Sequence, residues 1–121
     1  MNLGLVIYAG NIDSLSLFYI NALKFEKMDF DESYIRLVNS HSELVILKAT
    51  ENYATDSTSP REHSAIKPVF FTNETLINLR ASISTFGGYL KPANDEWCFN
   101  NFTVCDGHDT EGNIFQVRTE I

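Results

Sequence analysis

The stretch Asp109-Thr110-Glu111-Gly112-Asn113-Ile114-Phe115-Gln116-Val117 runs from a polar turn directly into a strand of alternating apolar and polar residues. Gly112 and Asn113 suit the left-handed backbone of a tight turn, and the Asp109 carboxylate can accept hydrogen bonds from neighbouring N–H groups. Such a turn is common by itself. It becomes informative because the chain also carries Phe18-Tyr19 on an early helix, and because its two halves repeat one order of elements.

Length and composition indicate a single globular domain. The chain has 121 residues, of which 44% are hydrophobic, and this is enough for one core. No apolar run approaches the ~20 residues that a membrane span needs, and the N-terminus lacks the basic start of a signal peptide. We therefore expect a cytoplasmic protein without membrane association, in which Cys98 and Cys105 are reduced.

The formal net charge of −7 argues against nucleic acid as a partner, because phosphate contacts require a basic face. An acidic surface usually serves solubility. The alternative is that it attracts a cationic ligand.

The first half of the sequence predicts a strand, a helix and three further strands. Asn11 or Asp13 is expected to cap the helix. The predicted strands are Leu3 to Ala9, Phe25 to Phe30, Tyr34 to Val38 and Glu43 to Ala49. Residues 50 to 65 are polar and rich in Thr and Ser, which predicts a connector.

The second half repeats this order. Asn73 or Thr75 is expected to cap a helix that ends at Gly87, and Asn11 and Asn73 hold matching positions, 73 − 11 = 62 residues apart. The helix should bury a stripe formed by Leu76, Leu79, Ile83 and Phe86. The predicted strands are Ile66 to Thr72, Tyr89 to Lys91, Trp97 to Val104 and Ile114 to Thr119. We expect one α+β domain, residues 1–121, with modules at 1–49 and 66–121.

The Phe-Tyr helix, the repeated halves and the final turn together resemble the glyoxalase/bleomycin-resistance/extradiol-dioxygenase superfamily, the vicinal oxygen chelate fold. In that superfamily the last turn typically reads Asp-Pro-Glu/Asp-Gly-Asn, and here Thr110 replaces the proline. The resemblance implies two β-α-β-β-β modules whose curved mixed sheets form a cup. It is closest to the metal-free, bleomycin-resistance-like members.

The resemblance also implies four metal-ligand positions. They fall on Gly4, Leu47 (with Lys48 the nearest alternative), Pro68 and Gln116. Only Gln116 offers a suitable side chain, and one neutral amide does not hold a divalent ion. The three histidines, His41, His63 and His108, fall in predicted turns or in the connector. We therefore expect neither a metal nor another cofactor.

Strand alternation predicts which side chains line the cup. The expected ligand-binding residues are Tyr8, Tyr34, Arg36, Phe70, Trp97, Phe99, Gln116 and Arg118. The same reasoning assigns Val69 and Phe71 to the core, and places Thr103 and Cys105 on the cup side, with Trp97 and Phe99, if Phe102 and Val104 are core. Asp106-Gly107 is interpreted as a turn, not as part of a nucleophilic Cys-Asp-His site.

An aromatic cup with a few polar groups is typical of a small-molecule site. The favoured hypothesis is a metal-independent protein that sequesters a small aromatic or amphipathic molecule and forms a homodimer. One alternative is a glyoxalase- or dioxygenase-like enzyme, a lyase or isomerase, with an atypical or absent metal site. The other is a non-catalytic interaction protein. Arg36 and Arg118 leave the charge of the ligand open, because arginine suits a carboxylate or phosphate better than a cation.

Overall fold

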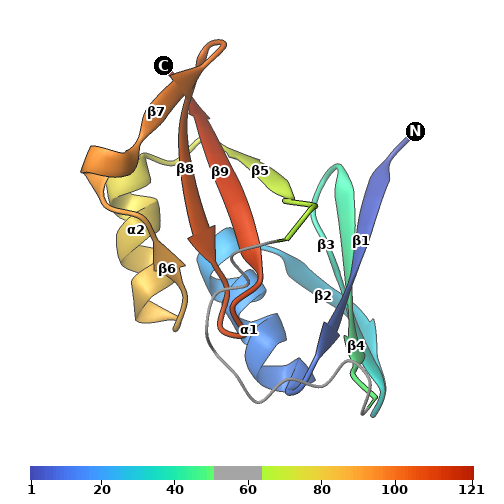
Figure 1. Ribbon diagram of the computed structural model, residues 1–121. Helices are drawn as coiled ribbons and strands as arrows, with labels where there is room; N and C mark the ends of the chain where they lie inside the picture. The colour runs from blue at the N-terminus through green and yellow to red at the C-terminus, as the bar shows by residue number, and fades with distance from the viewer. Residues whose placement is uncertain (51–63) are drawn as a thin grey trace. The chain divides into compact units, whose positions relative to one another are not determined.

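The computed structural model describes residues 1–50 and 64–121 (Figure 1). The chain divides into two compact units, Met1–Thr58 and Ser59–Ile121. Each unit contains one long helix and one mixed sheet, which confirms the α+β fold class. The predicted connector lies outside the described residues except at positions 50, 64 and 65. No described helix is long and apolar enough to cross a membrane.

The first unit has the predicted β-α-β-β-β order. Its sheet is arranged β1-β4-β3-β2, with β1 parallel to β4 and the other pairs antiparallel. The elements are β1 (Leu3–Ala9), α1 (Ile12–Leu23), β2 (Glu26–Phe30), β3 (Tyr34–Val38) and β4 (Ser42–Lys48). The strand bounds agree with the sequence prediction to within one residue at each end.

Helix α1 covers one face of the first sheet, and the core of the first unit lies between the helix and this face. The Asn11 side chain caps the helix by accepting a hydrogen bond from the Ser14 N–H at 2.9 Å. Phe18 and Tyr19, whose rings meet edge to face at 5.1 Å, are both buried. Strands β3 and β4 contribute four buried side chains to the same core, Ile35, Leu37, Leu44 and Ile46. Alternating residues of β3 and β4 therefore point to the opposite, open face.

The second unit has one strand more than predicted. Its sheet is arranged β5-β9-β8-β6, and β7 pairs with β8 beyond β6 (Figure 1). The elements are β5 (Val69–Thr72), α2 (Leu76–Thr85), β6 (Tyr89–Leu90), a 3-10 turn (Ala93–Asp95), β7 (Trp97–Phe99), β8 (Phe102–His108) and β9 (Ile114–Glu120).

Helix α2 begins and ends close to the predicted positions, with two corrections. Its cap is Thr75, whose hydroxyl accepts from the Asn78 N–H at 3.2 Å, so the matching caps lie 75 − 11 = 64 residues apart. Asn73 is not the cap. Gly87 ends the helix with a left-handed φ of 91°. Phe86 does not join the buried stripe, because 40% of it is exposed.

The predicted strand from Trp97 to Val104 is wrong, because this segment is a hairpin. Asn100 turns the chain between β7 and β8 with a left-handed φ of 54°. The Asp106-Gly107 pair, interpreted as a turn, lies inside β8. Gly107 is required there for a different reason: a Cβ atom would lie 2.3 Å from the Tyr89 carbonyl oxygen on β6. The glycine therefore permits a close strand approach.

In the final turn, Asp109 accepts hydrogen bonds from neighbouring N–H groups, as predicted. Its Oδ1 accepts hydrogen bonds from the N–H groups of Glu111 at 2.9 Å and Asn113 at 3.0 Å. Gly112 takes the left-handed conformation with φ of 82°, while Asn113 does not. The turn places Phe115 and Val117 in the core and turns Gln116 and Arg118 to the other face of β9.

Candidate functional site

The open face of the first sheet contains the three residues predicted for it. Tyr34 and Arg36 alternate with the core residues of β3, and Tyr8 and Tyr34 flank Leu47 on β4 in register. Tyr8 is the more accessible of the two tyrosines. Strand alternation therefore assigned the face correctly, and the role of these residues in ligand binding stays a prediction.

Arg36 is held by two carboxylates on this face. Its guanidinium contacts Asp29 at 2.8 Å and Glu43 at 3.1 Å, and the Tyr34 hydroxyl donates to Asp29 at 2.9 Å. The bonds from Arg36 and then Tyr34 lower the pKa of Asp29, and the Asp29 carboxylate raises the pKa of Tyr34. With one cation and two anions, this group carries a formal charge of −1, which opposes anion binding.

The sequence interpretation missed Asp29 and Glu43. Glu43 pairs with Gly4 and Val38 across the sheet, on the same face as Arg36. Asp29 reaches Arg36 because a bulge between Lys27 and Asp29 shifts the register of β2 against β3. Parity of β3 and β4 could have found Glu43, but no local sequence signal marks the bulge.

A polar hollow of about 320 Å³ lies beside this network. It is formed by the start of β1, the end of β3 and the β3–β4 turn. Its lining includes Gly4, Arg36, His41 and Glu43. The hollow has few apolar walls, and it therefore lacks the apolar lining typical of a drug-sized ligand site.

In the second unit, the assignment for β5 is wrong by one residue. Phe70 pairs with Val117, and its ring meets the buried Phe115 edge to face at 5.7 Å, so it belongs to the core side. Phe71 pairs with Arg118 and is 65% exposed. The first strand of this unit begins at Val69 and not at Ile66. Because this short segment is apolar on both faces, its sequence does not indicate which face is buried.

The β8 assignment is reversed in the same way. Val104 pairs with Arg118 and Trp97, so all three share one face, whereas Cys105 pairs with the core residue Val117. Trp97 and Phe99 lie on the predicted face, but not for the predicted reason. They belong to a separate strand, β7, and not to one continuous strand with Val104. The register of β7 with β8 carries both aromatics to the side of Arg118.

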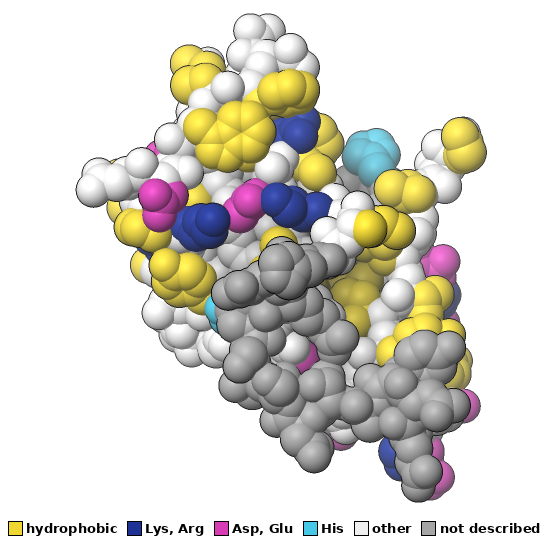
Figure 2. All heavy atoms as spheres, viewed as in Figure 1, with side chains coloured by type: hydrophobic (Ala, Val, Ile, Leu, Met, Phe, Trp, Pro, Cys, Tyr) yellow, Lys and Arg dark blue, Asp and Glu magenta, His cyan; other side chains and the backbone are white. Residues whose placement is uncertain are grey.

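These residues form an aromatic face on the second sheet, which we define as Phe71, Trp97, Phe99, Phe102 and Arg118. Trp97 and Phe99 are each 45% exposed, and Phe71 meets Phe102 edge to face at 5.2 Å. Figure 2 shows hydrophobic side chains gathered over the end of this unit where β7 lies, with a basic side chain among them.

Arg118 lies among the rings of this aromatic face. Its guanidinium carbon is 4.9 Å from the Phe99 ring centroid and 5.8 Å from that of Phe71. Its Nε donates to the Gln116 Oε1 at 2.8 Å. Within residues 1–50 and 64–121, no carboxylate forms an ion pair with Arg118.

A chain of polar contacts fixes the Gln116 amide. Its Nε2 donates to Asp106 Oδ1 at 3.0 Å, and the other oxygen of Asp106 is bound by the Lys67 ammonium at 2.7 Å. Burial would raise the pKa of Asp106, but the hydrogen bonds from Lys67 and Gln116 outweigh it and hold that pKa below the ordinary value. The charges of Lys67 and Asp106 cancel, so Arg118 is the cation of this network that has no carboxylate partner within the described part of the chain.

The residues at the superfamily's metal-ligand positions do not fit a divalent ion. Gly4, Leu47 and Pro68 carry no donor atom, and the Gln116 amide is committed on both sides, to Asp106 and to Arg118. Among the described residues, no three His, Cys, Asp or Glu side chains gather as a metal site would require. No catalytic step through a metal can be derived from these positions.

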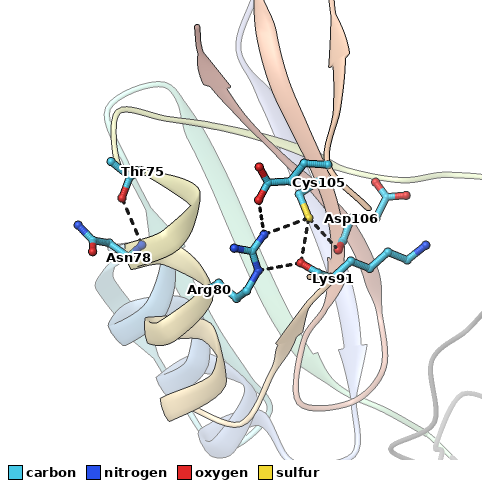
Figure 3. Close-up of polar contacts among 7 residues, drawn as sticks. Thr75, Asn78, Arg80, Lys91, Cys105 and Asp106 are labelled. Carbon is cyan, nitrogen blue, oxygen red and sulfur yellow. Dashed lines mark hydrogen bonds and ion pairs between the residues drawn. The ribbon is translucent and has the colours of Figure 1, made fainter. Parts of the chain in front are cut away.

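Cys105 lies on the helix side of the second sheet and not on the open face (Figure 3). Its Sγ is 3.8 Å from Arg80 of α2 and 3.3 Å from the Lys91 carbonyl oxygen, while Arg80 pairs with Glu96. Burial raises the pKa of the Cys105 thiol, despite the opposing effect of Arg80. His108 contacts the Asp109 carbonyl instead of Cys105, so no nucleophile–base pair exists here.

Comparison with known proteins shows which solved structures have a similar fold. The sequence matches no family model and no curated protein. Among solved structures, TnmS3, an antibiotic binding protein from Streptomyces sp. CB03234, is similar with a TM-score of 0.71 and 9% identity, over 100% of this chain and 96% of that chain.

Two further structures are similar over nearly their whole lengths. A glyoxalase/bleomycin resistance protein from Albidiferax ferrireducens T118 gives a TM-score of 0.70 with 12% identity, covering 98% of this chain and 97% of that chain. The fosfomycin resistance protein FosX from Listeria monocytogenes gives 0.69 with 14% identity, covering 100% and 92%. The chain thus has the fold of the glyoxalase/bleomycin-resistance proteins, and the resemblance read from the sequence is confirmed at the level of fold.

Proposed function

We propose that the protein binds a small aromatic or amphipathic molecule on the aromatic face of its second unit, without a metal. The observation that carries the proposal is the exposure of Phe71, Trp97 and Phe99 on one face of one sheet. Large aromatic side chains left open to water on a rigid sheet provide a stacking surface for a planar ligand.

The fold and its neighbours support this class of function. One structure of similar fold is named as an antibiotic binding protein, and another as a fosfomycin resistance protein. The donor-poor positions Gly4, Leu47 and Pro68 support binding over metal chemistry. An enzyme of the lyase or isomerase class remains the alternative. If that enzyme used an atypical metal site, elemental analysis of purified protein would find about one divalent ion per chain, and Gln116→Ala would release it.

The proposal also includes a homodimer. The sheet of the first unit ends in two strands that expose large apolar side chains, including Leu3 on β1 and Met28 and Phe30 on β2. Exposed apolar edge strands favour pairing with a second chain. Sedimentation should give a dimer at micromolar concentration, and a monomer at every loading would contradict this part of the proposal.

The binding site is tested with N-phenyl-1-naphthylamine, a neutral aromatic probe. The chain has one tryptophan, Trp97, which lies on the proposed face, so probe binding there should quench its fluorescence. Phe71→Ala should weaken binding of the probe by roughly 1–2 kcal/mol, the worth of an aromatic contact.

Phe86→Ala is the control, because Phe86 at the C-terminal end of α2 is also an exposed phenylalanine (40% against 65% for Phe71) but does not belong to the aromatic face. It should leave the affinity unchanged. Equal effects of the two changes, or binding that does not quench Trp97, would remove the site from the aromatic face. A chain that binds neither this probe nor a charged aromatic would favour the interaction-protein alternative.

A further inference from the structure

The two open faces differ in charge, and this difference bears on what the aromatic face selects. On the first sheet, Arg36 lies between Asp29 and Glu43. On the second, Arg118 has an amide oxygen and two ring faces as its neighbours. Among the described residues, the second arginine therefore has no carboxylate partner, and it lies beside exposed aromatic rings.

The hydrogen-bonding capacity of Arg118 points in the same direction. A guanidinium has five N–H donors, and the contact to Gln116 uses the Nε–H. The four N–H bonds of the two terminal nitrogens have no partner among the described residues. They form the planar, forked end that recognises carboxylate, sulfonate or phosphate oxygens in pairs.

Arg118 is also held in place before any ligand arrives. Lys67 fixes Asp106, Asp106 fixes the Gln116 amide, and Gln116 receives the Arg118 Nε–H. Gln116 is buried, so this support is rigid at its base. A cation held against aromatic rings loses less freedom on binding than a free surface side chain would. Glu120 shares the face two residues further along β9, but it forms no ion pair with Arg118.

We propose that the ligand class is a planar aromatic anion, whose ring stacks on Phe71, Phe99 or Trp97 while its acidic group binds the terminal N–H groups of Arg118. This inference rests on the proposed function and adds the charge that the ligand must carry. A cationic aromatic would meet Arg118 with repulsion on this face, in spite of the net charge of −7 on the whole chain.

Two probes that differ by one acidic group test the inference. 8-Anilinonaphthalene-1-sulfonate carries the aromatic skeleton of N-phenyl-1-naphthylamine with one added sulfonate. Arg118→Gln should weaken binding of the sulfonate probe roughly tenfold, the size of a charge-assisted hydrogen bond partly exposed to water, and leave the neutral probe unaffected. Added salt should weaken only the sulfonate probe.

Lys48→Gln is the matched control for net charge. It removes one positive charge from an exposed position on β4 of the first unit and should alter neither affinity.

The outcomes separate the two proposals. If Arg118→Gln leaves both affinities unchanged while Phe71→Ala weakens both, the aromatic face binds ligands but the charge selection is wrong. If Arg118→Gln and Lys48→Gln weaken the sulfonate probe equally, only the overall charge matters and the inference fails. If neither probe responds to Phe71→Ala, the proposed function itself fails.

Discussion

Arg36 and Arg118 lie on the open faces of two units that each combine one helix with one mixed sheet, yet the surroundings of the two arginines are opposite. Arg36 is bound by two carboxylates, whereas Arg118 lies against two phenylalanine rings and an amide. Strand alternation makes the same prediction for the two arginines, since both alternate with core residues on their strands. What separates them is the register of the neighbouring strands, which delivers acidic groups in one unit and aromatic rings in the other.

The turns of the two units show a second contrast. In the first unit, Asn39 Oδ1 accepts hydrogen bonds from His41 N–H at 3.1 Å and from Ser42 N–H at 2.9 Å, in an exposed loop. In the second, Asp109 makes the equivalent bonds while completely buried. The same turn chemistry is therefore part of the surface in one unit and part of the core in the other.

The largest expected effect tests this contrast between turns. Asp109→Ala should lower the free energy of unfolding by about 3 kcal/mol, because it removes a fully buried carboxylate and leaves the partly buried N–H groups of Glu111 and Asn113 without this acceptor. Asn39→Ala should cost less than about 1 kcal/mol, since water can replace its side chain. Urea unfolding of the two variants measures both values. Similar losses for the two changes would show that burial does not distinguish the turns.

The next effect separates the two faces of β5. Phe70→Ala should lower the free energy of unfolding by roughly 2 kcal/mol, because the ring packs on Phe115 in the core. Phe71→Ala should leave stability within about 0.5 kcal/mol, because Phe71 is largely exposed. Thermal or urea unfolding decides between them. If Phe71→Ala cost more stability than Phe70→Ala, Phe71 would be the core residue and Phe70 would lie on the open face.

The sequence predicted the first unit better than the second, for identifiable reasons. Regular alternation of apolar and polar residues in β3 and β4 predicts both the strands and the face that each side chain occupies. Asn11 predicts the start of α1, because asparagine is a favoured N-cap residue. In the second unit, Asn100 was not recognised as a turn residue and Gly107 was mistaken for one. The missed turn at Asn100 exchanged the two faces of β8, because the side-chain period in a strand is two residues.

The candidate site shows the same limit. Alternation places Arg118, Gln116, Trp97 and Phe99 on the face where the structure has them, and their role in binding stays a prediction. It assigns Phe71 to the core, because a short apolar strand gives no sign of which side is covered. Asp106 was missed because it was placed in a turn. The partners that give Arg36 and Arg118 their different charges come from neighbouring strands, and pairing register is not written in any single segment.

The smallest expected effect isolates the carboxylate partners of Arg36. The hydrogen bonds from Arg36 and Tyr34 lower the pKa of Asp29, so Arg36→Gln should raise that pKa toward its ordinary value, as NMR titration of the side-chain carboxyl would show. A depressed folded pKa contributes stability that is present above the unfolded pKa and is lost as pH falls through the folded value. The variant should therefore lose the stabilising contribution of Asp29 at neutral pH and differ least from the native chain in strong acid. Arg118→Gln serves as the control, because Arg118 forms no ion pair with a carboxylate of the described residues, and it should leave the Asp29 pKa unchanged. If Arg36→Gln also left that pKa unchanged, Arg36 would not be neutralised by Asp29, and the contrast between the two arginines would disappear.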